Sequence, residues 1–180
     1  MKTTFLLLSF FVFFLSSAPC FGHARLRVSL SDGSVPRLIP RNISDANKGG
    51  DSPESLPCGS ASLERGNNPV VLVVGETVPV EIEETINHVG RFLVNFSPAA
   101  ERDFISLIDR EDPNVPISSG MPQRYTESFV VPNSPCTDCI IQFVQVMEPN
   151  TAYYKACVDV IVTTPEEPPP AKPSGFVVTK

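Results

Sequence analysis

The sequence contains no tryptophan, only two histidines, and only 14 basic residues among 180. Its formal net charge is −6, and lysine and arginine form no basic stripe, so binding to a nucleic-acid backbone is excluded as a function class. Any metal site built on imidazole must use both His23 and His88. The 19 prolines favour turns and extended segments over long helices, while 42% hydrophobic residues suffice for a packed core.

The first 22 residues have the pattern of a signal peptide. Lys2 provides the positive start, Phe5 to Leu15 form an apolar segment, and small residues follow. Cleavage after Gly22 makes His23 the first residue of the mature chain, but cleavage after Ala24 also satisfies the small-residue rule. No later apolar run is as long, so we expect a secreted protein without a membrane span.

The remaining pattern predicts an all-β domain over residues 23–164, followed by a proline-rich tail over 165–180. Alternating or β-branched runs predict strands, and one segment, 99–110, predicts a short helix. Short strands separated by turn residues favour an antiparallel β-sandwich. The alternation of Glu81 and Glu83, followed by Glu84, indicates a solvated strand face. The expected strands are a first one near Leu26 and then 70–74, 78–83, 91–96, 128–131, 139–147 and 153–163.

Four cysteines remain after signal cleavage, and an even count in an exported chain predicts two disulfides. A hairpin turning near Asn150 would offset Cys139 and Cys157 by four residues, roughly 13 Å along the strands. A disulfide requires Cα atoms within about 7 Å, so Cys58–Cys157 and Cys136–Cys139 are the expected pairs. Sequons at Asn42 and Asn95 predict glycosylation in a eukaryotic host.

An N-terminal histidine offers two metal donors, its α-amine and its ring. Together with His88, in the connection between two expected strands, His23 would supply three nitrogens in a T-shaped set. Such a planar, nitrogen-rich arrangement suits Cu(II), whereas zinc prefers a tetrahedral one. The two histidines therefore predict a site for one copper ion per chain.

Five segments occur in an order that resembles the lytic polysaccharide monooxygenases and their histidine-brace relatives. They are His23-Ala-Arg-Leu, Pro57-Cys58-Gly59, Glu84-Thr-Ile-Asn-His88-Val-Gly90, Cys136-Thr-Asp-Cys139 and Tyr153-Tyr-x-x-Cys157-x-Asp159. The resemblance implies an immunoglobulin-like or fibronectin III-like β-sandwich with copper on an exposed face. It also implies that His23 and His88 bind the metal, with Asp159 as the preferred axial ligand and Tyr154 as the alternative.

Two functions are compatible with such a site. The first is a secreted, monomeric enzyme that uses copper and an external electron donor to cleave glycosidic bonds oxidatively. The second is a non-catalytic copper-binding or copper-acquisition protein with the same brace, and a metal-free structural module is a third interpretation. The absence of tryptophan and the presence of only three tyrosines argue against a crystalline substrate and favour a soluble glycan or copper handling.

Overall fold

The computed structural model describes residues 24–27, 38–41, 47–48, 55–59, 64–113, 120–148 and 152–166, and within these ranges the chain forms strands and no helix. The strands are β1 (Ala24–Leu26), β2 (Asn47–Lys48), β3 (Val70–Val73), β4 (Thr77–Glu84), β5 (Gly90–Ser97), β6 (Ile105–Asp112), β7 (Gln123–Val130), β8 (Cys136–Met147) and β9 (Ala152–Thr163).

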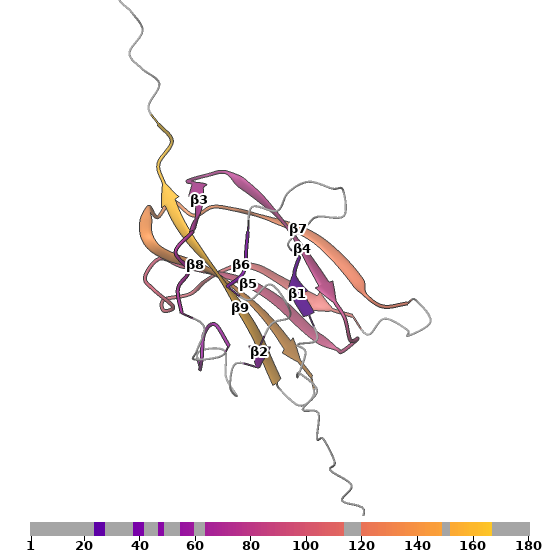
Figure 1. The fold of residues 1–180 in the computed structure, drawn as a ribbon. Helices are drawn as coiled ribbons and strands as arrows, with labels where there is room; N and C mark the ends of the chain where they lie inside the picture. Colours follow the sequence, from indigo (N-terminus) through magenta and orange to yellow (C-terminus); the bar gives the residue numbers. More distant parts are fainter. Residues whose placement is uncertain are drawn as a thin grey trace, which may run out of the picture.

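The strands form two sheets, which confirms the expected all-β sandwich (Figure 1). The smaller sheet has the order β1-β4-β7 and the larger one the order β2-β9-β8-β5-β6. All of these pairings are antiparallel, whereas β3 pairs with β9 in parallel. The first residues of β1 and β5 and the last residues of β4, β6 and β8 lie at the same end of the sandwich, called the histidine end below.

The core lies between the sheets and follows the two-residue period of the strands. Phe92, Phe96 and Phe143 are completely buried from the larger sheet, and Val78 and Ile82 from the smaller one. Burying each of these side chains contributes about 1.5–3 kcal/mol. The alternation that predicted the strands therefore also selects the residues that hold the layers together.

The helix expected over 99–110 is wrong, because this segment is a turn followed by the edge strand β6. Ala100, Glu101 and Asp103 have positive φ angles, which a helix does not allow. The β5–β6 register shifts at Val94, so that the neighbouring residues Leu107 and Ile108 both contact the core. This bulge breaks the alternation and gives the strand an apolar spacing similar to that of a helix.

Both expected disulfides are present. Cys58 and Cys157 have Cα atoms 5.1 Å apart, and Cys136 and Cys139 have Cα atoms 5.9 Å apart. The register used to predict them was off by one residue, since Cys157 pairs with Gln142 and Cys139 pairs with Val160. The offset of three residues, about 10 Å, still prevents a bond between Cys139 and Cys157.

We expect loss of the Cys58–Cys157 bond to lower the free energy of unfolding by about 4 kcal/mol, because it joins residues 99 positions apart. The Cys58→Ala/Cys157→Ala variant can be measured by urea unfolding. The Cys136→Ala/Cys139→Ala variant is the matched control and should lose less, since its loop is short. Equal losses in the two variants would contradict this account.

Candidate metal centre

His88 lies in the connection between β4 and β5, at the histidine end. Its backbone N–H donates to Oε1 of Glu84 at 2.8 Å, and its side chain is partly buried. The Glu148 N–H donates to the carbonyl of Val89 at 2.8 Å, which attaches the connection to the end of β8. His88 is therefore fixed from both sheets.

His23 lies outside the described residues, but the residue that follows it is well placed. Ala24 is completely buried and pairs with Glu84, the residue whose carboxylate accepts the His88 N–H. Consecutive Cα atoms are 3.8 Å apart, so the bond to Ala24 limits how far His23 can be from this point. The fold thus places His88 and Ala24, the residue that follows His23, at the histidine end.

A glycine makes the close approach of β5 and β8 possible at this end. A Cβ added to Gly90 would lie 1.8 Å from the carbonyl oxygen of Val146, far inside van der Waals contact. Only glycine can therefore occupy the position two residues after His88.

A buried polar cluster lies beneath the histidine connection and consists of Glu84, Asp112, Tyr125 and Gln145. The Tyr125 hydroxyl donates to Oε2 of Glu84 at 3.4 Å, whereas the carboxyl oxygens of Asp112 and the side-chain amide of Gln145 are buried without a hydrogen-bond partner among the described residues. Burial and, secondly, the negative charge of Glu84 raise the pKa of Asp112 to about 8. Burial also raises the pKa of Glu84. The two carboxyl groups therefore hold a proton between them near neutral pH.

Asp112 was missed by the sequence analysis because the preceding segment was interpreted as helical. In the strand β6 it pairs with Gly90, and so its side chain faces the core. An acidic residue at an inward position of a strand was the signal that could have identified it.

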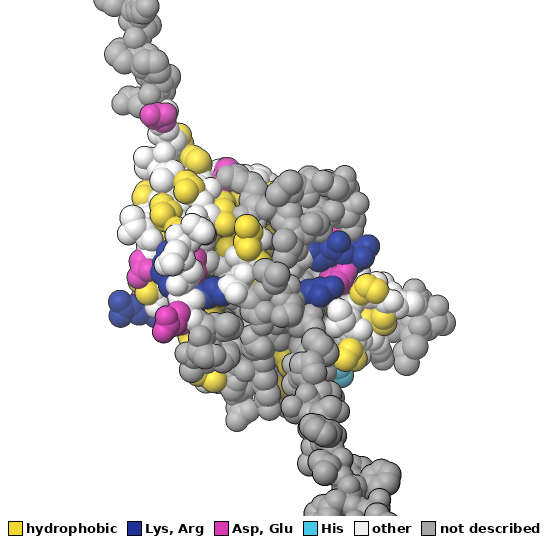
Figure 2. All heavy atoms as spheres, viewed as in Figure 1, with side chains coloured by type: hydrophobic (Ala, Val, Ile, Leu, Met, Phe, Trp, Pro, Cys, Tyr) yellow, Lys and Arg dark blue, Asp and Glu magenta, His cyan; other side chains and the backbone are white. Residues whose placement is uncertain are grey.

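Glu81, Glu83 and Glu84 are not on a solvated face, contrary to the expectation, and Glu84 is completely buried. Glu81 and Glu83 are 3% and 2% exposed and lie beneath arginines from β1, β7 and the residue after β1. Glu83 accepts from Arg25 Nε at 2.9 Å, from Arg27 Nη1 at 2.5 Å and from Arg124 Nε at 3.0 Å. Figure 2 shows basic side chains gathered over acidic ones near the described histidine. This network, called the arginine–glutamate anchor below, fastens β1 to β4.

The pKa of Glu83 is set by two opposing effects, burial and the hydrogen bonds from its arginine partners. Burial acts to raise it, but the hydrogen bonds from Arg25, Arg124 and Arg27 together outweigh burial and lower the pKa to about 2. Glu83 therefore remains ionised far below neutral pH.

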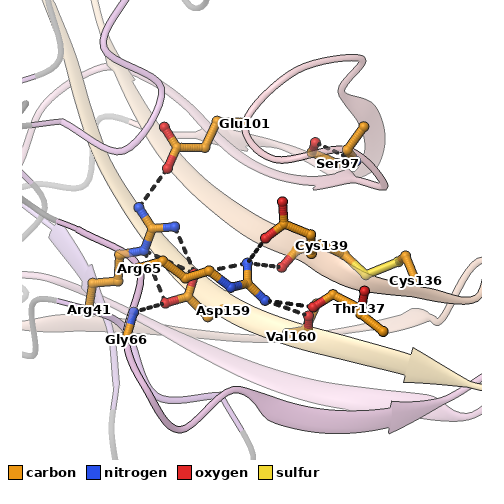
Figure 3. Close-up of polar contacts among 12 residues, drawn as sticks. Arg41, Arg65, Gly66, Ser97, Glu101, Cys136, Thr137, Cys139, Asp159 and Val160 are labelled. Carbon is orange, nitrogen blue, oxygen red and sulfur yellow. Dashed lines mark hydrogen bonds and ion pairs between the residues drawn. A yellow bond between two sulfur atoms is a disulfide. The ribbon is translucent and has the colours of Figure 1, made fainter.

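Asp159, the preferred axial ligand, is not brought to His88. It pairs with Ile140, seven residues along β8 from Met147 at the histidine end, a distance of about 23 Å. Its carboxylate accepts from Arg41 Nη2 at 2.7 Å, from Arg41 Nε at 3.0 Å and from the Gly66 N–H at 2.6 Å, and it pairs with Arg65 at 3.4 Å (Figure 3). Asp159 is therefore an anchor for the loops that cover β9.

Tyr154, the alternative axial group, lies near the histidine end. It pairs with Gln145 of the buried cluster and faces the core with Ala156, Val158 and Val160, as strand parity predicted. Among the candidates on β9, only Tyr154 combines this end with an inward direction.

Other sequence-based site residues have mixed outcomes. Asn42 lies outside the described residues, whereas Asn95 Nδ2 donates to Oε1 of Gln142 at 2.8 Å.

In the described part of the chain, no group of three or more histidine, cysteine or acidic side chains is arranged to hold a metal ion. No helix of these residues is long and apolar enough to cross a membrane.

Similar folds occur among solved structures. An AA10 lytic polysaccharide monooxygenase from Streptomyces lividans is 14% identical with a TM-score of 0.41, over 63% of this chain and 66% of that chain. An AA15 lytic polysaccharide monooxygenase from Thermobia domestica, in the Cu(I) state, is 16% identical with a TM-score of 0.42, over 58% and 74% of the two chains. A chitin binding domain from Burkholderia pseudomallei is 12% identical with a TM-score of 0.46, over 78% and 99%.

No protein-family model matches the sequence, and no curated protein matches it.

The arginine–glutamate anchor generates a prediction about acid stability. Because the pKa of Glu83 falls from 4.5 to about 2 on folding, its stabilisation is complete above pH 4.5 and disappears as the pH falls towards 2. We expect Glu83→Gln to cost about 3 kcal/mol of unfolding free energy at pH 7 and to flatten the loss below pH 4.5. Urea unfolding at several pH values measures both effects.

The exposed Glu111→Gln variant is the control and should keep the pH profile of the unaltered protein. Parallel profiles for Glu83→Gln and Glu111→Gln would show that the anchor does not set the acid stability.

Proposed function

We propose that this chain is an exported mononuclear copper protein that cleaves glycosidic bonds of a polysaccharide oxidatively. One observation carries the proposal: Ala24 pairs with Glu84, whose carboxylate accepts the His88 N–H. Processing after Gly22 would make His23 the free N-terminus directly beside this pair. The donors would be the amine and ring of His23 and the ring of His88, a set that suits Cu(II).

The protein's contribution is to hold these donors in a fixed relation. Glu84 fixes the His88 backbone, and the arginine–glutamate anchor fixes the strand that begins one residue after His23. The buried cluster of Glu84, Asp112, Tyr125 and Gln145 lies at this end of the core, beneath the connection that carries His88.

We propose Tyr154 as the residue nearest the axial position, in place of Asp159. Asp159 is about 23 Å along the sheet from the histidine end and its oxygens are occupied by Arg41, Arg65 and Gly66. Tyr154 faces the core beside Gln145.

The surface around His88 supports contact with a carbohydrate chain. Ile86 and Val89 flank His88 and are 47% and 43% exposed, and Met121 is 36% exposed just before β7. Aliphatic side chains of this kind can contact the apolar faces of sugar rings, although no flat tryptophan surface exists in this sequence. Bound copper would supply the one-electron chemistry needed for oxidation, with an external donor as the source of electrons.

We expect protein secreted through its own signal peptide to bind one Cu(II) with a nitrogen-coupled electron paramagnetic resonance signal. His88→Ala should reduce copper affinity by more than the roughly 10–100-fold typical of changes outside the ligand set. One extra residue before His23 should act similarly, because it converts the chelating amine into an amide. Isothermal titration with Cu(II) measures these losses.

Tyr154→Phe and Asp159→Asn form a matched pair for the axial position. Tyr154→Phe should change the copper spectrum, whereas Asp159→Asn should leave it unchanged in protein shown to be folded. The opposite outcome would restore Asp159 as the axial ligand, and no specific signal in unaltered protein would refute the copper site.

Copper-loaded protein with ascorbate should release oxidised oligosaccharides from at least one glycan in a panel that includes soluble substrates. Mass spectrometry detects these products, and His88→Ala should abolish them. Tight copper binding without oxidised products from any glycan would instead establish the copper-carrier function.

A further inference from the structure

A hollow lies far from the histidine end, against the outer face of β9. It has a volume of about 310 Å³ and includes Arg41 and Asp159 in its wall. Figure 3 shows these two side chains meeting, with Gly66 beside the carboxylate. The hollow is independent of the proposed copper site, because Asp159 is seven residues along the sheet from that end.

Two charged side chains in the wall of this hollow, Arg41 and Asp159, are held in place by ion pairs. Arg41 and Asp159 side chains are each 6% exposed, and Arg41 also pairs with Glu101 at 2.6 Å. Arg65 extends the network by donating to the carbonyls of Thr137 and Cys139 at 3.0 and 3.1 Å. A site whose side chains are already fixed loses little conformational entropy when a ligand binds.

The remaining lining is polar on one side and aliphatic on the other. Asn67, Asn68 and Glu64 are exposed and present two amides and a carboxylate, while Ile39 and Pro40 provide apolar surface. Amides and carboxylates exchange hydrogen bonds with hydroxyl groups, and aliphatic carbon packs against C–H groups. A sugar ring presents both kinds of surface.

The charge and the volume of the hollow restrict the class of ligand further. Arg41 and Arg65 are outnumbered by Asp159, Glu101, Asp138 and Glu64, so an anion would be repelled. The volume is at the lower limit of ligand pockets, which suits a single ring.

We propose that this hollow is a binding site for one uncharged sugar residue, distinct from the copper site. It would hold a glycan or its end without chemistry, because Arg41 and Asp159 are engaged with each other. Binding there would be weak, in the range of millimolar dissociation constants expected for a few hydrogen bonds and one small apolar contact.

The test is a nuclear magnetic resonance titration of the full mature, metal-free chain with glucose, N-acetylglucosamine, glucosamine and glucuronate. We expect the two neutral sugars to shift the amide signals of Gly66, Asn67 and Asn68, and glucuronate to leave them unchanged. Asn67→Ala/Asn68→Ala should weaken binding at least tenfold, while the exposed Asn133→Ala, which does not line the hollow, should bind as the unaltered chain does.

Shifts confined to the histidine end, no shifts at all, or shifts at Gly66, Asn67 and Asn68 caused by glucuronate would overturn the proposal. If the double variant does not fold, the amide signals that shift in the unaltered chain show whether the sugar binds at this hollow. Because the chain carries no copper in this experiment, its outcome is separate from that of the copper proposal.

Discussion

Burial of the Glu83 carboxylate beneath Arg25, Arg27 and Arg124 is the interaction on which the histidine end depends. The strand β1 has only three residues, and a ladder of that length cannot hold a strand in place by itself. Burying a carboxylate is costly unless it is paired, and removing one partner of a buried pair costs about 3–5 kcal/mol. The anchor therefore fixes β1 against β4.

The outer face of β9 holds the segments that cover it. Lys155 donates to the carbonyl of Ser55, Cys157 is bonded to Cys58, and Asp159 holds Arg41 and Gly66. These three residues alternate along the strand, so each outward position fastens one covering segment, while the inward positions between them pack in the core. One strand thus carries the core on one side and the loops on the other.

Much of this could be predicted from the sequence, because a period of two determines which face each residue of a strand occupies. Parity correctly placed Tyr154 inward, and cysteine spacing correctly paired the disulfides. The segment before Asp112 was misjudged because a bulge interrupts its alternation. The surroundings of Glu83 and Asp159 could not be predicted, since their arginine partners are 41 to 118 residues away in the chain. A sequence motif gives the identity of a side chain such as Asp159. Its distance from the histidine end depends on how its strand pairs with the neighbouring strand.

Gly90 has a consequence for how this scaffold could diversify. Because Gly90 has no side chain, β5 can begin in contact with the Val146 carbonyl. The connection that carries His88 ends at this contact. Exposed positions such as Ile86 and Val89 can change without disturbing the sheet, because their side chains point away from it. The connection is therefore divided into exposed positions that tolerate change and one fixed position, Gly90, where any larger residue would displace the segment that carries His88.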